Sequence, residues 1–83
     1  ATHELAKSTI RIYPNPVSDQ LNIDVEGQLE FIVSLYDLNG KQIFMLKNER
    51  FIDVNSILQG TYLLKIEDIK TGQNIVDKIM IGK

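Results

Sequence analysis

Short runs in which apolar and polar side chains alternate are the feature of this sequence that most constrains its fold. In residues 20–25 the apolar side chains of Leu21, Ile23 and Val25 alternate with polar ones. Successive side chains of an extended chain point to opposite faces, so this pattern predicts a β-strand with one buried face. Comparable runs predict six further strands, at residues 10–13, 29–36, 41–47, 50–54, 61–67 and 73–81.

Turn-forming residues separate these runs. Pro14 and Pro16 end the first strand, because proline fixes φ and lacks an amide hydrogen. We expect this Pro-Asn-Pro segment to cross between sheets rather than to pair. Asn39 and Gly40 lie between two β-rich runs and both tolerate positive φ, which predicts a hairpin. Residues 55–60 predict a tight turn or a single helical turn closed by glycine.

Seven short strands without a helix of useful length predict an all-β fold, an immunoglobulin-like antiparallel β-sandwich. The run at 29–36 carries apolar residues on both faces, so we expect this strand near the middle of a sheet. Residues 31–36 and 43–46 would instead suit buried helices if they were longer. The β-branched residues and the glycine and Asx punctuation around them favour strands.

The length and charge of the chain limit its domain organisation and its partners. Its 83 residues suffice for one domain, and we assign residues 1–9 to a lead-in and residues 10–83 to the folded domain. A net charge of -2 argues against nucleic acid as a partner. No apolar run is long enough to span a membrane. The chain begins at Ala1 without the features of a signal peptide, and we expect it to be a fragment of a longer protein.

Candidate catalytic and metal-binding residues are few. The single histidine, His3, lies in the lead-in, and the chain has no cysteine. The serines have no second histidine as a base, and we expect no metal and no other cofactor. Residues 37–40 are faintly similar to a calcium loop, but the closing glutamate is missing and a hairpin turn explains the segment better. We expect the aspartates near turns to bond local backbone, and we expect no enzymatic activity.

The aromatic residues all fall within or next to predicted strands: Tyr13, Phe31, Tyr36, Phe44, Phe51 and Tyr62. We expect them to pack in the core or across strands, whereas a carbohydrate-binding platform would expose their faces. Stacking on sugars stays open as an alternative. We expect Lys65, Lys78 and Lys83 to face solvent and to protect the edges of sheets from pairing.

Four short motifs, taken together, resemble one protein family. Residues 13–23, YPNPVSDQLNI, match its YPNPxxxxLxI opening, and residues 35–43, LYDLNGKQI, are similar to its central LYDxxGKxV hairpin. Residues 60–66, GTYLLKI, follow its GxYxLxI pattern, and Lys-plus-apolar residues form the last motif at 78–81. In this order and spacing the motifs resemble the type A C-terminal sorting domain of the type IX secretion system. The candidate recognition residues are Pro14, Asn15, Pro16, Asp37, Gly40, Lys41, Gly60, Tyr62, Lys78, Ile79 and Ile81.

The resemblance implies a seven-stranded immunoglobulin-like fold and a role in protein secretion by Bacteroidetes-type bacteria. Such a domain acts as an address that directs an upstream cargo protein across the outer membrane. The implied partners are translocon or shuttle proteins, the upstream cargo, and a sortase-like protease that cuts ahead of the domain, within or upstream of the lead-in. The implied location is the periplasm in transit, then the cell surface or the extracellular space, where the cargo is attached or released.

An address shared by many cargoes needs a recognisable surface rather than a catalytic pocket. We expect the last strand, residues 73–81, to offer edge backbone groups or alternating side chains to a translocon subunit. We expect the Pro-Asn-Pro segment to fix the crossover rather than to touch a receptor. Edge strands would also allow a homodimer. The alternative function is an accessory immunoglobulin-like binding or adhesion module that recognises polysaccharide or a cell-surface protein.

Overall fold

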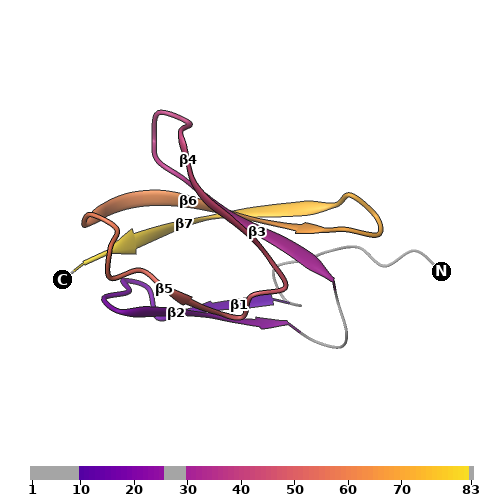
Figure 1. The fold of residues 1–83 in the computed structure, drawn as a ribbon, viewed down its shortest axis with the longest axis horizontal. Helices are drawn as coiled ribbons and strands as arrows, with labels where there is room; N and C mark the ends of the chain where they lie inside the picture. Colours follow the sequence, from indigo (N-terminus) through magenta and orange to yellow (C-terminus); the bar gives the residue numbers. More distant parts are fainter. Residues whose placement is uncertain (1–9, 26–29, 83) are drawn as a thin grey trace.

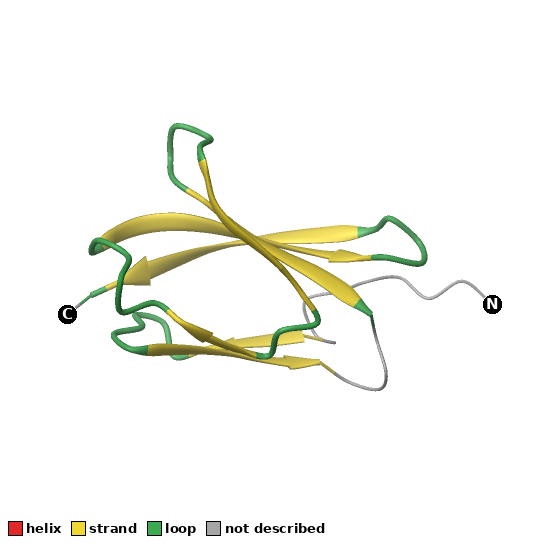
Figure 2. Cartoon of the chain, viewed as in Figure 1, coloured by secondary structure: helices red, strands yellow, loops and turns green. Residues whose placement is uncertain are grey.

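Seven β-strands make up the regular structure of the protein (Figure 1). The computed structural model describes residues 10–25 and 30–82, so the lead-in with His3, and Lys83, lie outside the described residues. None of the described residues is helical, as Figure 2 shows. The all-β prediction is therefore confirmed. The strands are β1 (Ile10–Tyr13), β2 (Gln20–Val25), β3 (Phe31–Tyr36), β4 (Gln42–Lys47), β5 (Phe51–Asp53), β6 (Gly60–Asp68) and β7 (Asn74–Ile81).

The strands form two antiparallel sheets that pack face to face. One sheet has the strand order β1-β2-β5 and the other has the order β4-β3-β6-β7 (Figure 1). β3 lies between β4 and β6, so its predicted central position is confirmed. This arrangement is the predicted immunoglobulin-like sandwich. In the described part of the chain no helix is long and apolar enough to cross a membrane.

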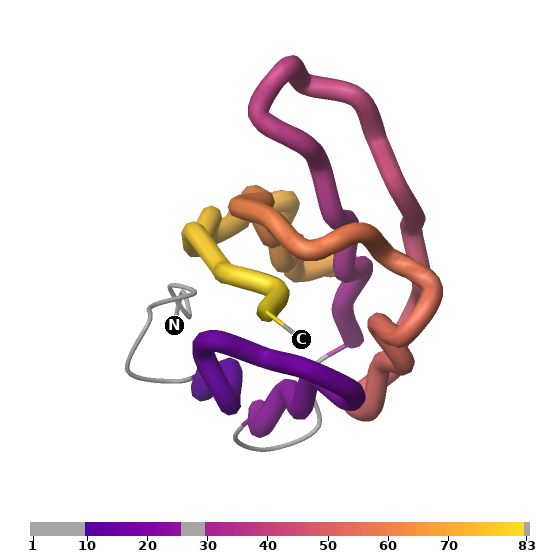
Figure 3. Tube along the Cα trace, turned by 90° about the vertical axis from the view of Figure 1, so that its left-hand side faces the viewer, coloured from indigo at the N-terminus to yellow at the C-terminus, as the bar shows by residue number. Residues whose placement is uncertain are grey.

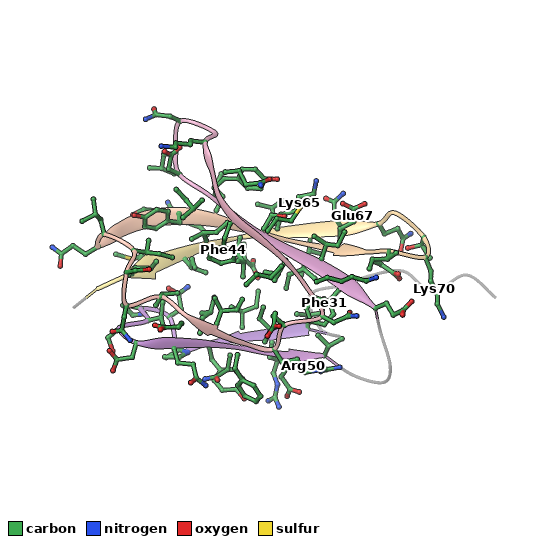
Figure 4. All side chains as sticks on the ribbon, in the orientation of Figure 1. Phe31, Phe44, Arg50, Lys65, Glu67 and Lys70 are labelled. Atoms are coloured by element: carbon green, nitrogen blue, oxygen red, sulfur yellow. The ribbon has the colours of Figure 1, made fainter. Side chains whose placement is uncertain are left out.

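The apolar faces of the two sheets meet in one core. Leu21 of β2, Leu35 of β3 and Leu64 of β6 are completely buried, as their places in the alternation predict. Phe31 is also buried, and the guanidinium carbon of Arg50 lies 5.8 Å from the centre of its ring (Figure 4). The buried apolar residues described are Ile10, Val17, Leu21, Ile23, Val25, Phe31, Val33, Leu35, Ile52, Val54, Tyr62, Leu64, Ile66, Ile79 and Ile81.

The hairpin between β3 and β4 forms where it is predicted. The carboxylate of Asp37 accepts hydrogen bonds from the amides of Asn39 and Lys41, both at 2.9 Å. The amide of Gly40 donates to the carbonyl of Asp37 at 3.1 Å, and Gly40 has a φ of 89°. Of the two residues that tolerate positive φ, Gly40 adopts it in this turn and Asn39 does not. The Asp37 carboxylate organises this turn by bonding backbone amides.

Aspartates near other turns also bond local backbone, as predicted. The carboxylate of Asp53 accepts from the amide of Asn55 at 2.8 Å, and that of Asp68 accepts from the amide of Lys70 at 2.9 Å. The segment between β5 and β6 is a turn without a helical turn, closed by a hydrogen bond from the Ile57 amide to the Val54 carbonyl. These side chains replace backbone partners that the turns lack.

Two predictions about side-chain placement are wrong. Tyr13 is 49% exposed and Phe51 is 67% exposed, although we expect all six aromatic residues to be packed. Lys65 does not lie at an edge, because β6 is flanked by β3 and β7. Lys65 and Glu67 instead project from the outer face of the larger sheet, with Nζ 3.9 Å from a carboxylate oxygen of Glu67 (Figure 4). Alternation determines which residues share a face but not whether that face is covered.

Replacing Gly40 with alanine should destabilise the domain. No atom lies within 4 Å of the added Cβ, so the cost comes from the positive φ, and we expect a loss of about 1–2 kcal/mol. For a domain of this length that corresponds to a fall in Tm of roughly 4–16 °C, which thermal melting followed by circular dichroism would measure. Gly82→Ala is the control, because Gly82 has no positive φ and its added Cβ meets Pro16 at an ordinary 3.9 Å. Equal Tm losses in both variants would contradict the explanation.

Candidate recognition surface

Three of the four sequence motifs meet at one end of the sandwich. Residues 14–17 pack beside the end of β7, where Val17 forms a parallel bridge with Ile81. The start of β6 pairs with the same residues of β7, with Gly60 opposite Ile81 and Tyr62 opposite Ile79. We call this region, formed by residues 14–17, 60–62 and 78–82, the motif end. Figure 1 shows it on the left, where the described chain finishes.

The fourth motif lies apart from the motif end. Asp37, Gly40 and Lys41 belong to the β3–β4 hairpin, whose tip stands away from the rest of the sandwich in two perpendicular views (Figures 1 and 3). Gly40 and Lys41 are exposed and Asp37 is half-buried. The structure therefore brings together eight of the eleven candidate recognition residues and leaves the three hairpin residues at a distance.

The side-chain amide of Asn15 joins the first motif to the last. Its oxygen accepts a hydrogen bond from the amide of Met80 at 2.9 Å, and its nitrogen donates to the carbonyl of Lys78 at 3.2 Å. A neighbouring strand would place its own peptide groups in these two positions. Asn15 lies between two prolines whose preceding peptide bonds are both cis. One side chain thus takes the place of a peptide group beside β7.

Val17 continues the same attachment through its backbone. Its amide donates to the carbonyl of Met80 at 2.8 Å, and its carbonyl accepts from the amide of Gly82 at 2.9 Å. Its side chain is completely buried in the core. The chain therefore crosses from β1 to the edge of the larger sheet, as predicted for the Pro-Asn-Pro segment, and its backbone pairing begins at Val17.

Three of the candidate recognition residues are buried beneath the surface of the motif end. Ile79 and Ile81 are buried in the core, and Tyr62 is only 9% exposed. The Tyr62 hydroxyl donates to the carbonyl of Leu58 at 2.6 Å, which fastens the turn before β6. An added Cβ on Gly60 would lie 3.7 Å from the Tyr62 ring. In the folded domain these three buried side chains support the motif end from within and are hardly accessible to a partner.

The exposed residues of the motif end are the ones that a partner could contact. Pro14, Asn15, Pro16 and Lys78 are exposed, and so is Met80, which is 52% exposed. Sequence reasoning did not select Met80 or Val17. The signal available for Met80 was its place between Ile79 and Ile81, because residues that alternate with buried ones on a strand point outward.

The described residues also carry charged and polar side chains outside the motif end. No group of three or more histidine, cysteine, aspartate or glutamate residues in the described chain is arranged to hold a metal ion. Arg11 and Asp24 form an exposed ion pair at 3.0 Å on the outer face of the smaller sheet. Every buried side-chain polar atom described has a hydrogen-bond partner.

The architecture defines a small immunoglobulin-like sandwich with its sequence motifs gathered at one end. A family model described as "Secretion system C-terminal sorting domain" matches residues 11–82, and the chain belongs to this family. Its membership makes the chain a C-terminal sorting signal of the type IX secretion system and implies export to the cell surface or the extracellular space. The resemblance derived from the four motifs is confirmed.

Among solved structures the chain is similar to PorZ. PorZ is described as an essential bacterial surface component of the type-IX secretion system of human oral-microbiomic Porphyromonas gingivalis. The TM-score is 0.71 at 16% sequence identity, which shows a shared fold. The match covers 93% of this chain but only 12% of the PorZ chain. No curated protein matches the sequence.

Replacing Asn15 with alanine should weaken the attachment of the first motif to β7. Two hydrogen bonds are lost, so we expect the free energy of unfolding to fall by about 1–3 kcal/mol, measured by urea denaturation. Asn74→Ala is the matched control, because Asn74 is an exposed residue of β7 whose side chain forms no hydrogen bond with residues 10–25 and 30–82. We expect the control to change stability by less than about 0.5 kcal/mol. A loss in Asn15→Ala no larger than in the control would contradict the role of the amide.

Proposed function

We propose that this domain directs an upstream cargo protein across the outer membrane through the type IX secretion system and is recognised in its folded state. The observation that carries the proposal is the gathering of three family motifs at one end of a folded sandwich. The family match spans nearly all of the described chain, so the motifs and the fold belong to one unit. Export signals of this kind act through surface recognition, which fits a surface with no metal cluster in its described part.

The direction of the first strand supports this role. β1 starts at Ile10, opposite Val25, and runs toward the Pro-Asn-Pro segment at the motif end. The start of β1 therefore lies away from the motif end (Figure 1). A cargo attached ahead of Ile10 would leave the motif end uncovered. The same recognition surface would then serve cargoes of different shape.

The proposal includes a route and a fate for the cargo. The cargo passes through the periplasm, and the partners in transit are translocon or shuttle proteins of the type IX system. A sortase-like protease then cuts ahead of the domain, and the cargo is attached to the cell surface or released. The domain itself contributes recognition and no catalysis. The family assignment supports this scheme because it identifies the chain as a sorting signal.

Fusing residues 10–83 behind a periplasmic reporter should carry the reporter out of the cell in a host with type IX machinery. We expect most of the reporter on the cell surface or in the medium, measured by protease accessibility of intact cells and by immunoblotting of the medium. The reporter without the domain, and the fusion in a host whose type IX translocon is deleted, should both stay in the periplasm. A fusion that is folded, stable and retained in the periplasm of the competent host would refute the proposal.

A second candidate function is supported by one separate observation. Tyr13 and Phe51 are both exposed and lie opposite Asn22, on the strands to either side of it, so all three share the outer face of the smaller sheet. Exposed aromatic rings beside amide side chains suit the stacking and hydrogen bonding of sugars. We infer from this face an accessory binding module for polysaccharide as the alternative to a sorting signal.

The second candidate predicts that the isolated domain binds a soluble neutral polysaccharide. Phe51→Ser should then lower the affinity roughly 5- to 160-fold, because a stacking ring contributes roughly 1–3 kcal/mol, and isothermal titration would measure the change. Leu58→Ser is the control, since Leu58 is exposed but lies outside the smaller sheet. No binding by the wild-type domain, or equal binding by both variants, would eliminate this candidate. Export of a Phe51→Ser fusion should match that of the wild type.

A further inference from the structure

The outer edge of β7 is a row of backbone groups that are hydrogen-bonded only near the C-terminal end of the strand. β7 is an edge strand and pairs on its inner side with β6. In an antiparallel pair, the amide and carbonyl of one residue point to the same side, and those of the next residue point to the other. The bonds from Asn15 and Val17 show that the groups of Lys78 and Met80 point outward. By the same alternation the backbone groups of Asn74 and Val76 point outward.

The two halves of this edge differ in what they contact. At the end nearest Gly82, the Lys78 carbonyl and both backbone groups of Met80 are bonded to Asn15 and Val17. The outward backbone groups of Asn74 and Val76, and the amide of Lys78, have no hydrogen-bond partner among residues 10–25 and 30–82. We call Asn74–Lys78 the open edge. Unpaired edge groups are a template for an additional strand.

We propose that an extended polypeptide segment of the secretion machinery adds to the open edge as a further strand of the larger sheet. This inference rests on the proposed function and names the contact surface for it. A row of alternating donors and acceptors at strand spacing is matched by the backbone of another extended chain. The open edge covers five residues, or about 17 Å, which suits a short segment.

The side chains along the open edge specify the segment further. Val76 is 46% exposed and Lys78 is exposed, and both lie on the outer face of the sheet. Residues directly opposite each other on neighbouring strands interact when they share a face. The matching segment therefore carries an apolar residue beside Val76 and an acidic residue beside Lys78.

The position of Asn15 argues against a second copy of this chain as the occupant. A two-fold axis through Val76 would pair the β7 strands of two copies and place Asn74 of one copy opposite Lys78 of the other. The Lys78 carbonyl is already bonded by Asn15 of its own chain. The bond from the Asn74 amide to this carbonyl would therefore compete with Asn15, and the pairing would keep only the bonds of Val76 and of the Lys78 amides. A short segment from another protein avoids this conflict, because it can end before it reaches Asn15.

Val76→Pro tests the open edge without removing a bond to β6. Proline lacks the amide hydrogen, and the amide of Val76 points away from β6, where edge strands tolerate proline. We expect the isolated variant to melt within about 5 °C of the wild type, and we expect export of the reporter fusion to fall at least tenfold. Val76→Thr is the matched control. It keeps the amide hydrogen and a β-branched side chain, and its export should stay within twofold of the wild type.

Asn74→Pro provides a second variant for the same edge. Proline is tolerated at the first residue of a strand, so this variant reports on the open edge if Val76→Pro melts too low to be informative. Wild-type export from a variant that melts like the wild type would overturn the inference. So would a wild-type dimer in sedimentation analysis that Val76→Pro converts to a monomer, since the occupant would then be a second copy. Failure of the wild-type fusion to leave the periplasm would instead refute the proposed function.

Discussion

The hydrogen bonds between Asn15 and β7 are the interaction on which the arrangement of the motifs depends. They connect residues 63 and 65 positions apart in the sequence and fasten the chain leaving the smaller sheet to the edge of the larger one. Val17 reinforces them with two backbone bonds and a completely buried side chain. The motif end exists because these contacts hold the beginning and the end of the described chain together.

Much of the fold could be predicted from the sequence, because alternation is a local property. Leu21, Ile23 and Val25 each occupy the core position that their spacing predicts, and the Asn39-Gly40 hairpin forms in place. Alternation does not determine which strands become neighbours. Alternation therefore does not predict that β6 with Lys65 lies inside its sheet, or that the face carrying Phe51 is uncovered. Those outcomes depend on contacts between distant segments.

The candidate recognition residues were predicted as a set but not by role. Motif resemblance selected Tyr62, Ile79 and Ile81 together with Asn15 and Lys78. Only the structure separates the buried residues, which shape the motif end, from the exposed ones, which a partner can reach. The bonds of Asn15 could not be predicted, because a side-chain amide between two prolines carries no information about which distant carbonyl it will meet. The bonds of Val17 could not be predicted for the same reason, whereas the alternation of Met80 with Ile79 and Ile81 already indicates that Met80 points outward.

The length of chain between Asn15 and Met80 has a consequence for biosynthesis. A ribosome releases Asn15 well before it has made Met80, and no earlier segment of the described chain bonds the Asn15 side chain. The contact between the opening turn and the final strand can therefore form only after nearly the whole described chain has been made. A nascent chain interrupted before residue 78 lacks the groups that bond the Asn15 side chain. Only a chain translated through β7 can therefore form the complete motif end.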